Sequence, residues 1–375
     1  MIIPAFNSDS RLMMFAPHPD DESLACSIIL QRAVRAGAAV RVVYATDGDD
    51  NPWPQRLLER KWRLNAADRK RWGKLRRTEA LAALHILGLQ PSSARFLALP
   101  DQKLTRLLTH DCKPALKRFG TIIAEWGPTH ILVPSVADTH PDHNALAVML
   151  RLVWANLLPD DPCFSVWSYV VHGRSPAFFH RAQKLRQSEF EKAIKLQAIR
   201  RHKTQLKLSR KRFLKYAARP ECLLKLDARE ATVTDGSIQS IWRQPSALHL
   251  KLKLSVSAVH VAKPTIFVLG YCMTGALRCV NIRLPVRSSH SEMSDCATGR
   301  CLGWAHYYGN AFAGEFTIPI DIFSPARALF VKLEDRSWFF DKAGWLETSS
   351  TVRSEHIRVQ ARNLSTAQSR PLFIE

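Results

Sequence analysis

A strand–loop–helix–strand unit near the start of the chain constrains the fold more than any other feature. An apolar run at 12–16 leads into an acid-rich loop, a helix-like segment at 23–36 and a second apolar run at 39–45. Gly37, directly after the helix-like segment, is a typical left-handed helix stop. Two strands joined through a helix pair in parallel with a right-handed crossover, because the other hand packs badly onto a twisted sheet. The unit therefore predicts an α/β fold.

Two later segments extend the same sheet. Apolar runs at 95–99 and 130–134 have strand-like composition, and helix-like segments at about 74–87 and about 114–126 precede them. Strands that alternate with helices are typical of parallel sheets. We therefore predict a Rossmann-like, three-layer, mostly parallel sheet.

The sequence changes character after about Leu226. Short runs in which apolar and polar residues alternate, such as 248–256, replace the helical patterns, and this predicts a smaller antiparallel β-sandwich. We expect two domains, at 1–228 and 229–375, with a tail from Ser354 onward. The second domain carries aromatic groups that either pack in its core and interfaces or bind sugar and cover the cleft of the first: Trp304, His306, Tyr307, Tyr308, Trp338, Phe339 and Phe340.

Acidic and imidazole side chains follow each predicted strand of the first domain. The carboxyl ends of parallel strands lie along one edge of a sheet, where ligands bind in the crevice between the loops. A merely solvated surface does not require that arrangement. We therefore expect one polar site at this edge, built from His18, Asp20, Asp21, Asp47, Asp101, Asp138, His140, Asp142 and His143.

The residue types at this edge are those of a catalytic metal site. His18, Asp21 and His143 form a two-histidine, one-carboxylate set, which suits Zn²⁺ with an open position for water, and which Fe²⁺ or another divalent metal also uses. Zinc lowers the pKa of a bound water to about 7. Asp20 cannot easily point the same way as its neighbour Asp21, so we expect it to be the general base.

Two further residues complete the expected chemistry. His140 could protonate a leaving nitrogen or stabilise an oxyanion, and Asp142 would fix its tautomer. Together these groups predict metal-assisted hydrolysis. We expect the polar residues left over at the edge, Asp47, Asp101 and Asp138, to contact substrate, with orientation of His140 as an alternative for Asp138.

Several motifs resemble those of the PIG-L, or LmbE-like, de-N-acetylases over about residues 11–225. A weaker similarity lies in the later run from Lys195 through Ala198 and His202 to Gln205. The main motifs are APHPDDE at 16–22, TDG at 46–48, the run from Arg76 through Glu79 and Ala83 to Gly88, LPD at 99–101 and HPDH at 140–143.

The resemblance implies a zinc-dependent hydrolase that removes acetyl from an N-acetylglucosamine-type sugar. It implies metal ligation by His18, Asp21 and His143, base catalysis by Asp20 and acid or electrostatic catalysis by His140. It also implies that Arg76 contacts substrate; the alternative for Arg76 is a helix-surface pair with Glu79. The chain has Ala-Cys-Ser at 25–27 where family members often have glycines, and Asp138 where related enzymes place a tyrosine.

Positive charge is concentrated in the first domain. The chain has 54 Lys and Arg against 33 Asp and Glu, a net charge of +21. Residues 229–375 hold 17 against 12, which leaves 37 against 21, or +16, for residues 1–228. Such a field favours an anionic partner, such as a phosphate-bearing or lipid-linked sugar or an anionic membrane surface, although a merely soluble basic surface is the alternative.

Other features bear on location and partners. The sequence has no apolar run long enough to span a bilayer and no secretory leader pattern, so we expect a cytoplasmic protein with peripheral membrane contact as an option. The residues at 49–73 form an irregular Trp- and Arg-rich insertion, and 183–218 a long basic helical region. The alternative to an enzyme is a basic nucleic-acid or membrane-binding protein on a relic hydrolase fold. We expect no specific nucleic acid, and the sequence leaves the amino-sugar acceptor and the oligomeric state open.

Overall fold

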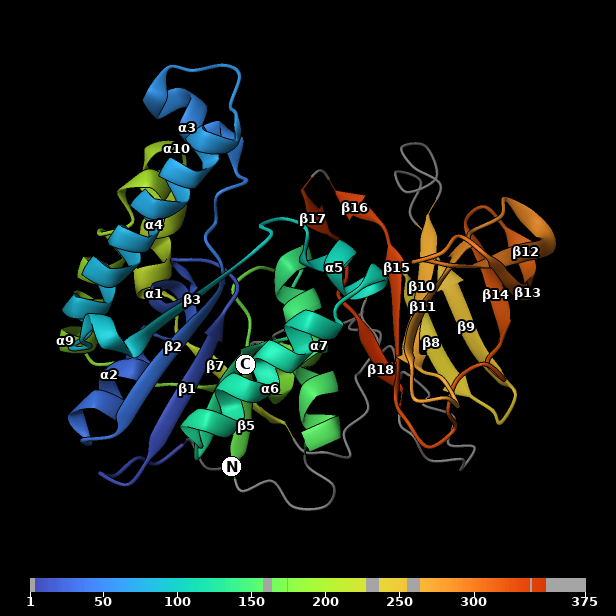
Figure 1. Cartoon of the computed structure of the whole chain (residues 1–375), viewed down its shortest axis with the longest axis horizontal. Coiled ribbons are helices and arrows are strands. Elements are labelled where there is room, and N and C mark those ends of the chain that lie inside the picture. The colour runs from blue at the N-terminus through green and yellow to red at the C-terminus, as the bar shows by residue number, and fades with distance from the viewer. Residues whose placement is uncertain are drawn as a thin grey trace, which may run out of the picture.

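The computed structural model describes residues 4–157, 164–173, 175–226, 236–254, 264–337 and 339–348. The tail from Ser354, Trp338 and the predicted domain boundary at 228/229 lie outside these residues. Two large sheets and the helices around the first of them make up the molecule (Figure 1).

The first sheet is mixed and mostly parallel. Its strands follow the order β3-β2-β1-β4-β5-β7-β6, of which β1 to β5 pair in parallel while β7 pairs antiparallel with β5 and β6. This confirms the predicted α/β architecture. The strands are β1 Arg11–Ala16, β2 Ala39–Thr46, β3 Ala94–Leu99, β4 His130–Pro134, β5 Ser165–Tyr169, β6 Gln183–Lys184 and β7 Cys222–Leu226.

Helices cover both faces of this sheet. In β1, Leu12 and Met14 face one helical layer while Met13 and Phe15 face the other, as the alternation of side chains along a strand requires. The first layer holds α1 Asp21–Ala25, α2 Ser27–Arg35, α4 Ala66–Ile86, α9 Glu189–Ile199 and α10 Lys203–Ala218. The second holds α5 Leu104–His110, α6 Lys113–Trp126 and α7 Pro141–Leu157. Three short helices complete this part: α3 Pro52–Glu59, η1 Pro91–Ser93 and α8 Pro176–Arg181.

Some helix boundaries differ from prediction. The segment expected at 23–36 is two helices, because the backbone of Cys26 leaves the helical region between α1 and α2. The insertion at 49–73 is largely ordered rather than irregular: it holds α3 and the first turns of α4, which a capping box between Asn65 and Asp68 starts eight residues early. The basic region at 183–218 is largely helical, as expected, and contains α9 and α10.

The second sheet is antiparallel, as expected, but it is one continuous sheet rather than a two-sheet sandwich. Its order is β18-β15-β10-β11-β12-β13-β14-β9-β8, and its edge strands β18 and β8 come into contact, so the sheet curls around its own apolar core. The strands are β8 Ile238–Arg243, β9 Ala247–Lys253, β10 Thr265–Tyr271, β11 Leu277–Arg283, β12 Arg287–Asp295, β13 Cys301–Asn310, β14 Ala313–Pro319, β15 Leu329–Glu334 and β18 Leu346–Thr348.

The curled sheet packs against the helical layer of α5, α6 and α7. Leu269, Phe330 and Trp345 from the second sheet belong to the same apolar cluster as those helices. The Trp345 backbone N–H donates to the Val136 carbonyl oxygen at 2.9 Å. A small hairpin, β16 Arg336–Ser337 and β17 Phe340–Asp341, projects from the second sheet toward the loops of the first (Figure 1).

Candidate metal centre and active site

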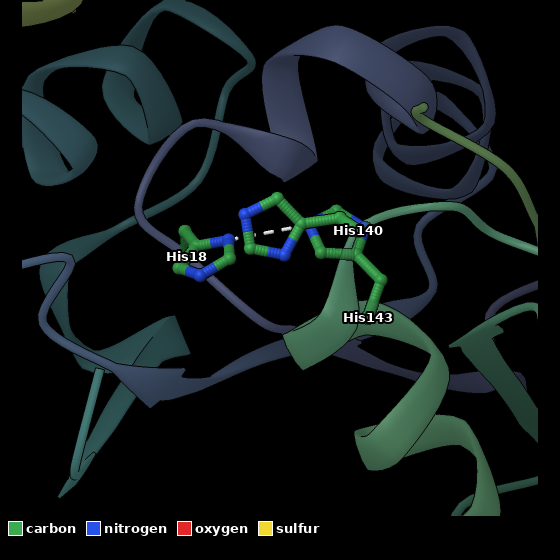
Figure 2. Close-up of side chains that lie close together, drawn as sticks. All are labelled: His18, His140 and His143. Atoms are coloured by element: carbon green, nitrogen blue, oxygen red, sulfur yellow. Dashed lines mark hydrogen bonds between the residues drawn. The ribbon is translucent and has the colours of Figure 1, made fainter. Parts of the chain in front are cut away.

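Three side chains from two loops converge at the carboxyl edge of the first sheet. His18 and Asp21 lie between β1 and α1, and His143 lies in the first turn of α7; Figure 2 shows the two histidines beside His140. His18 Nδ1 is 3.2 Å from His143 Nε2 and 3.5 Å from Asp21 Oδ2. His143 Nε2 is 3.4 Å from the same Asp21 oxygen. The sequence therefore placed these residues together correctly.

The spacing of these atoms suits a tetrahedral ion. Zinc bonds of about 2.0–2.1 Å at tetrahedral angles separate two ligand atoms by about 3.3–3.4 Å. The His18, Asp21 and His143 atoms form a triangle with sides of that length, and all three residues are buried. The residues present therefore fit a zinc ion, with a fourth direction left for substrate.

Two buried carboxylates orient His18. Its Nε2 lies 3.2 Å from Asp101 Oδ1 and 3.3 Å from Asp142 Oδ2. A carboxylate at Nε2 keeps the ring proton there, which leaves Nδ1 free to ligate. Burial disfavours the charged ring, but hydrogen bonds to these two carboxylates and Asp21 outweigh it and raise the pKa of His18 well above its usual value.

Asp138 orients the ring of His143 as Asp101 and Asp142 orient that of His18. Its Oδ2 lies 3.2 Å from His143 Nδ1, so the proton is held on the side away from Asp21. The Asp138 carboxylate also accepts the backbone N–H groups of His140 at 2.9 Å and Val171 at 2.9 Å. It thereby ties the ligand loop after β4 to the segment after β5.

These contacts correct several expected roles. Asp101 and Asp138 are buried and engaged with the ligand histidines, so they position the centre instead of facing substrate. Asp142 orients His18 and accepts the Leu104 N–H at 3.0 Å; only its backbone N–H reaches His140, at Nδ1. Asp47 is engaged by Arg77, whose Nε donates at 2.7 Å. The strand ends deliver more acids than one ion can bind: Asp101, Asp138 and Asp142 are buried as support, whereas Asp47 is only partly buried and pairs with Arg77.

Arg76 is another correction. It is 4% exposed, and its guanidinium donates to Asp20 Oδ2 at 3.0 Å and to the carbonyl oxygens of Pro19 and Gly48, each at 2.9 Å. It is therefore not a surface partner of Glu79; it is buried against the acid loop and holds Asp20. A Cβ at Gly48, whose φ is +63°, would lie 1.7 Å from Arg76 Nη1, so only glycine admits the guanidinium here.

Asp20 is left as the acid without a metal-ligand role. Burial is the largest influence on it and, opposed by the nearby Arg76 cation, raises the pKa of Asp20 to about 6. A carboxylate in this range is ionised at neutral pH and still basic enough to accept a proton. The roles of Asp20 as base and Asp21 as metal ligand stay a prediction, and the contact between Asp20 and Arg76 places Asp20 apart from the triangle of His18, Asp21 and His143.

His140 sits beside the ligand histidines as a neutral ring. Its centroid is 4.7 Å from that of His18 and 4.8 Å from that of His143. The Asp142 N–H donates to its Nδ1 at 3.2 Å, so the ring proton resides on Nε2. Burial, reinforced by the neighbouring His18 and His143 charges, lowers the pKa of His140 well below its usual value. It is therefore a hydrogen-bond donor through Nε2.

Other residues also border the site, among them two aromatic groups that the sequence offered as a cover for the cleft, Phe339 and Phe340. His172 lies 5.0 Å from His143, ring to ring, and Phe339 and Phe340 lie beside His140. Glu22, the last residue of the motif at 16–22, is buried and its Oε1 is 2.9 Å from His202 Nε2. The run from Lys195 to Gln205 was the available signal for the His202 contact.

Comparisons with known proteins identify relatives of the first domain. Residues 13–154 match the family model described as PIG-L: GlcNAc-PI de-N-acetylase. A 1D-myo-inositol 2-acetamido-2-deoxy-alpha-D-glucopyranoside deacetylase of Mycobacterium avium is 31% identical over 147 residues, which are 36% of this chain and 47% of that protein. The same enzyme of Mycolicibacterium paratuberculosis matches equally. The chain thus spans about half the length of the curated relatives it matches.

Solved structures with similarity to the chain have lower identity. The zinc-inhibited form of a teicoplanin deacetylase shares 16% identity at a TM-score of 0.45, and the match covers 58% of this chain and all of that one, 100%. An N,N'-diacetylchitobiose deacetylase from Pyrococcus horikoshii shares 18% identity at a TM-score of 0.45, with 58% of this chain and 84% of that one covered. On the family match, the motifs and the curated relatives, the chain carries a PIG-L, or LmbE-like, domain at residues 13–154.

Proposed function

We propose that this protein is a zinc-dependent hydrolase that removes the N-acetyl group from an N-acetylglucosamine-type amino sugar. The observation that carries the proposal is the arrangement around Asp21: a triangle of ligand atoms with sides of 3.2–3.5 Å, with Asp20 beside it as a separate, unligated carboxylate. The activities of the two mycobacterial relatives, which are deacetylases of an acetamido sugar, support the same reaction.

The residues of the chain divide the reaction between them. His18, Asp21 and His143 would hold a zinc ion, which would supply Lewis acidity to water and to the acetyl carbonyl. Asp20, held by Arg76, accepts the proton of the attacking water as the water oxygen bonds to the amide carbon. His140 donates its Nε2–H to the carbonyl oxygen, where negative charge develops. The C–N bond then breaks and the nitrogen takes the proton from Asp20. The second water proton, left on the acetic acid, passes to the amine, so acetate and an ammonium group leave.

The substrate class follows from charge. The first domain carries a net +16, so we propose a phosphate-bearing or lipid-linked acetamido sugar as the preferred substrate. In the described part of the chain, no helix has both the length and the hydropathy to cross a bilayer.

Acetate release is the direct test. The panel comprises N-acetylglucosaminyl-inositol, its phosphatidylinositol form, a nucleotide-linked N-acetylglucosamine, diacetylchitobiose and an acylated glycopeptide. We expect release from at least one, with the phosphate-bearing members preferred. Failure of the zinc-loaded protein on the whole panel would contradict the proposal.

Metal content tests the ligand set separately. We expect one zinc per chain by plasma mass spectrometry, and Asp20→Asn protein that keeps the zinc and loses acetate release. The variant His18→Ala with His143→Ala should lose the metal. Unchanged zinc content in that double variant would show that the ion sits elsewhere.

A further inference from the structure

The second sheet sends two aromatic side chains into the active site of the first domain. On and beside β17, Phe339 lies 5.2 Å and Phe340 5.7 Å from His140, ring centroid to ring centroid. Phe340 is also 5.3 Å from His172, and the Arg212 guanidinium lies over its ring at 5.5 Å. The hairpin therefore borders the residue that faces the developing oxyanion.

A buried polar network fixes the hairpin to the metal-ligand loop. Asp341, directly after Phe340, accepts from Asn144 Nδ2 at 2.9 Å and from the buried Lys332 ammonium. Lys332 also donates to Asn144 Oδ1 at 3.2 Å, and the Asp341 N–H donates to the Thr139 carbonyl oxygen at 2.8 Å. Asn144 is adjacent to His143. Removing either partner of a buried ion pair is strongly destabilising, so the pair between Lys332 and Asp341 keeps the hairpin beside the loop of His143.

The exposure of the two rings differs. Phe340 is half-buried among His140, His172 and Arg212, whereas Phe339 is 37% exposed. An aromatic ring that is partly open to solvent next to a buried polar centre is what a ligand pocket uses to orient a ring with an apolar face and polar edges. A pyranose has such a face in its axial C–H groups.

We propose that the hairpin of the second domain completes the substrate site, with Phe339 as the platform on which the apolar face of the acetamido sugar rests and Phe340 as the wall beside its acetyl group. This rests on the proposed function. It assigns the second domain to substrate recognition, and it means that the first domain alone has an incomplete site.

The test compares two phenylalanines of the same domain. Phe339→Ala should raise KM for the best acetamido sugar of the panel about two- to tenfold with kcat little changed, and Phe339→Trp should restore it. Phe312→Ala is the matched control, because Phe312 is 46% exposed and lies in the β13–β14 turn, away from the hairpin. Equal kinetics for Phe339→Ala and Phe312→Ala would overturn the proposal.

A second readout does not depend on turnover. Binding of methyl N-acetylglucosaminide to the metal-stripped full chain, followed by saturation-transfer NMR, should weaken by the same factor in Phe339→Ala and stay unchanged in Phe312→Ala. If the wild type binds in this way but releases no acetate, the substrate platform stands and the proposed hydrolysis fails. If acetate is released but Phe339→Ala changes neither assay, only the substrate platform fails. If the wild type neither binds the sugar nor releases acetate, the platform and the proposed hydrolysis both fail.

Discussion

At the residue scale, substitution of Arg76 tests whether this residue positions Asp20 or contacts substrate. Its guanidinium bonds Asp20 and two backbone carbonyl groups, and a lysine ammonium cannot span those three acceptors. We expect Arg76→Lys to lower kcat for acetate release about ten- to hundredfold, the range for residues that hold a catalytic group in place, with little change in KM. Steady-state kinetics on the zinc-loaded protein measures the two constants.

The control for Arg76 lies on the same helix. Arg71 of α4 is largely exposed and pairs with Glu59 and Asp68, away from the acid loop, so Arg71→Lys should leave both constants unchanged. If Arg76→Lys instead raises KM without lowering kcat, Arg76 contacts substrate, as the resemblance implied, and does not position Asp20.

The sequence could predict that His18, Asp21 and His143 come together, but not the contacts of every acid near them. His18, Asp21 and His143 follow strand ends, and the parallel sheet alone brings them to one edge. Whether Asp101 or Asp138 faces substrate or supports a histidine depends on side-chain direction and burial, which tertiary packing decides. Their support of His18 and His143 is therefore visible only in three dimensions.

At the element scale, Glu191 joins α9 to α2. It closes the capping box of α9 with Ser188 and accepts from Arg32 Nε at 2.9 Å, and this hydrogen bond is the main reason that the pKa of Glu191 falls from 4.5 to about 2. We expect Glu191→Gln to reduce the free energy of unfolding at pH 7 by about 1–2 kcal/mol, a modest figure because Arg32 is partly exposed.

The pH dependence of the Glu191 effect has a definite sign. A carboxylate with a lowered folded-state pKa stabilises the protein above its unfolded-state pKa, and this contribution is lost as pH falls. The difference between wild type and Glu191→Gln should thus be constant above about pH 5.5 and shrink from pH 4.5 toward 2. Urea unfolding over this range measures it, and the exposed Glu189→Gln is the control. A difference that grows on acidification would rule out this role for Glu191.

Element types were easier to predict than their ends. The unit from β1 to β2 has apolar runs and a Gly37 stop, and both strands occur as expected. The break at Cys26 and the early start of α4 depend on packing and on a side-chain cap, which weak local propensity does not reveal.

At the scale of the whole molecule, Gly344 sets how closely the two sheets approach. A Cβ at this position would lie 1.7 Å from the Val136 carbonyl oxygen, next to the backbone bond between Trp345 and Val136. We expect Gly344→Ala to cost about 1–3 kcal/mol of unfolding free energy and to separate the unfolding of the two sheets in a calorimeter scan. Ala343→Ser is the neighbouring control, and a single unchanged transition for Gly344→Ala would contradict the close approach.

The end of the molecule formed by α3 and α10 has the character of a membrane-facing surface. The two helices pack together there (Figure 1), and they and the loop after α3 expose Trp53, Leu57, Leu58, Trp62 and Leu208. Arg56 lies over both tryptophan rings, at 5.0 and 5.3 Å. Tryptophan and leucine flanked by basic residues bind at the headgroup level of anionic bilayers.

We therefore expect the full chain to co-sediment with vesicles that contain phosphatidylserine and much less with neutral ones. Trp53→Ala with Trp62→Ala should reduce the bound fraction at least several-fold, because the two rings supply much of the exposed apolar area at this end. Trp304→Ala with Phe312→Ala, which removes comparably exposed aromatic groups from the second sheet, is the matched control. Equal loss in both double variants would mean a non-specific effect. Binding to DNA that persists at moderate salt and depends on Trp53 and Trp62 would instead identify this end as a nucleic-acid surface.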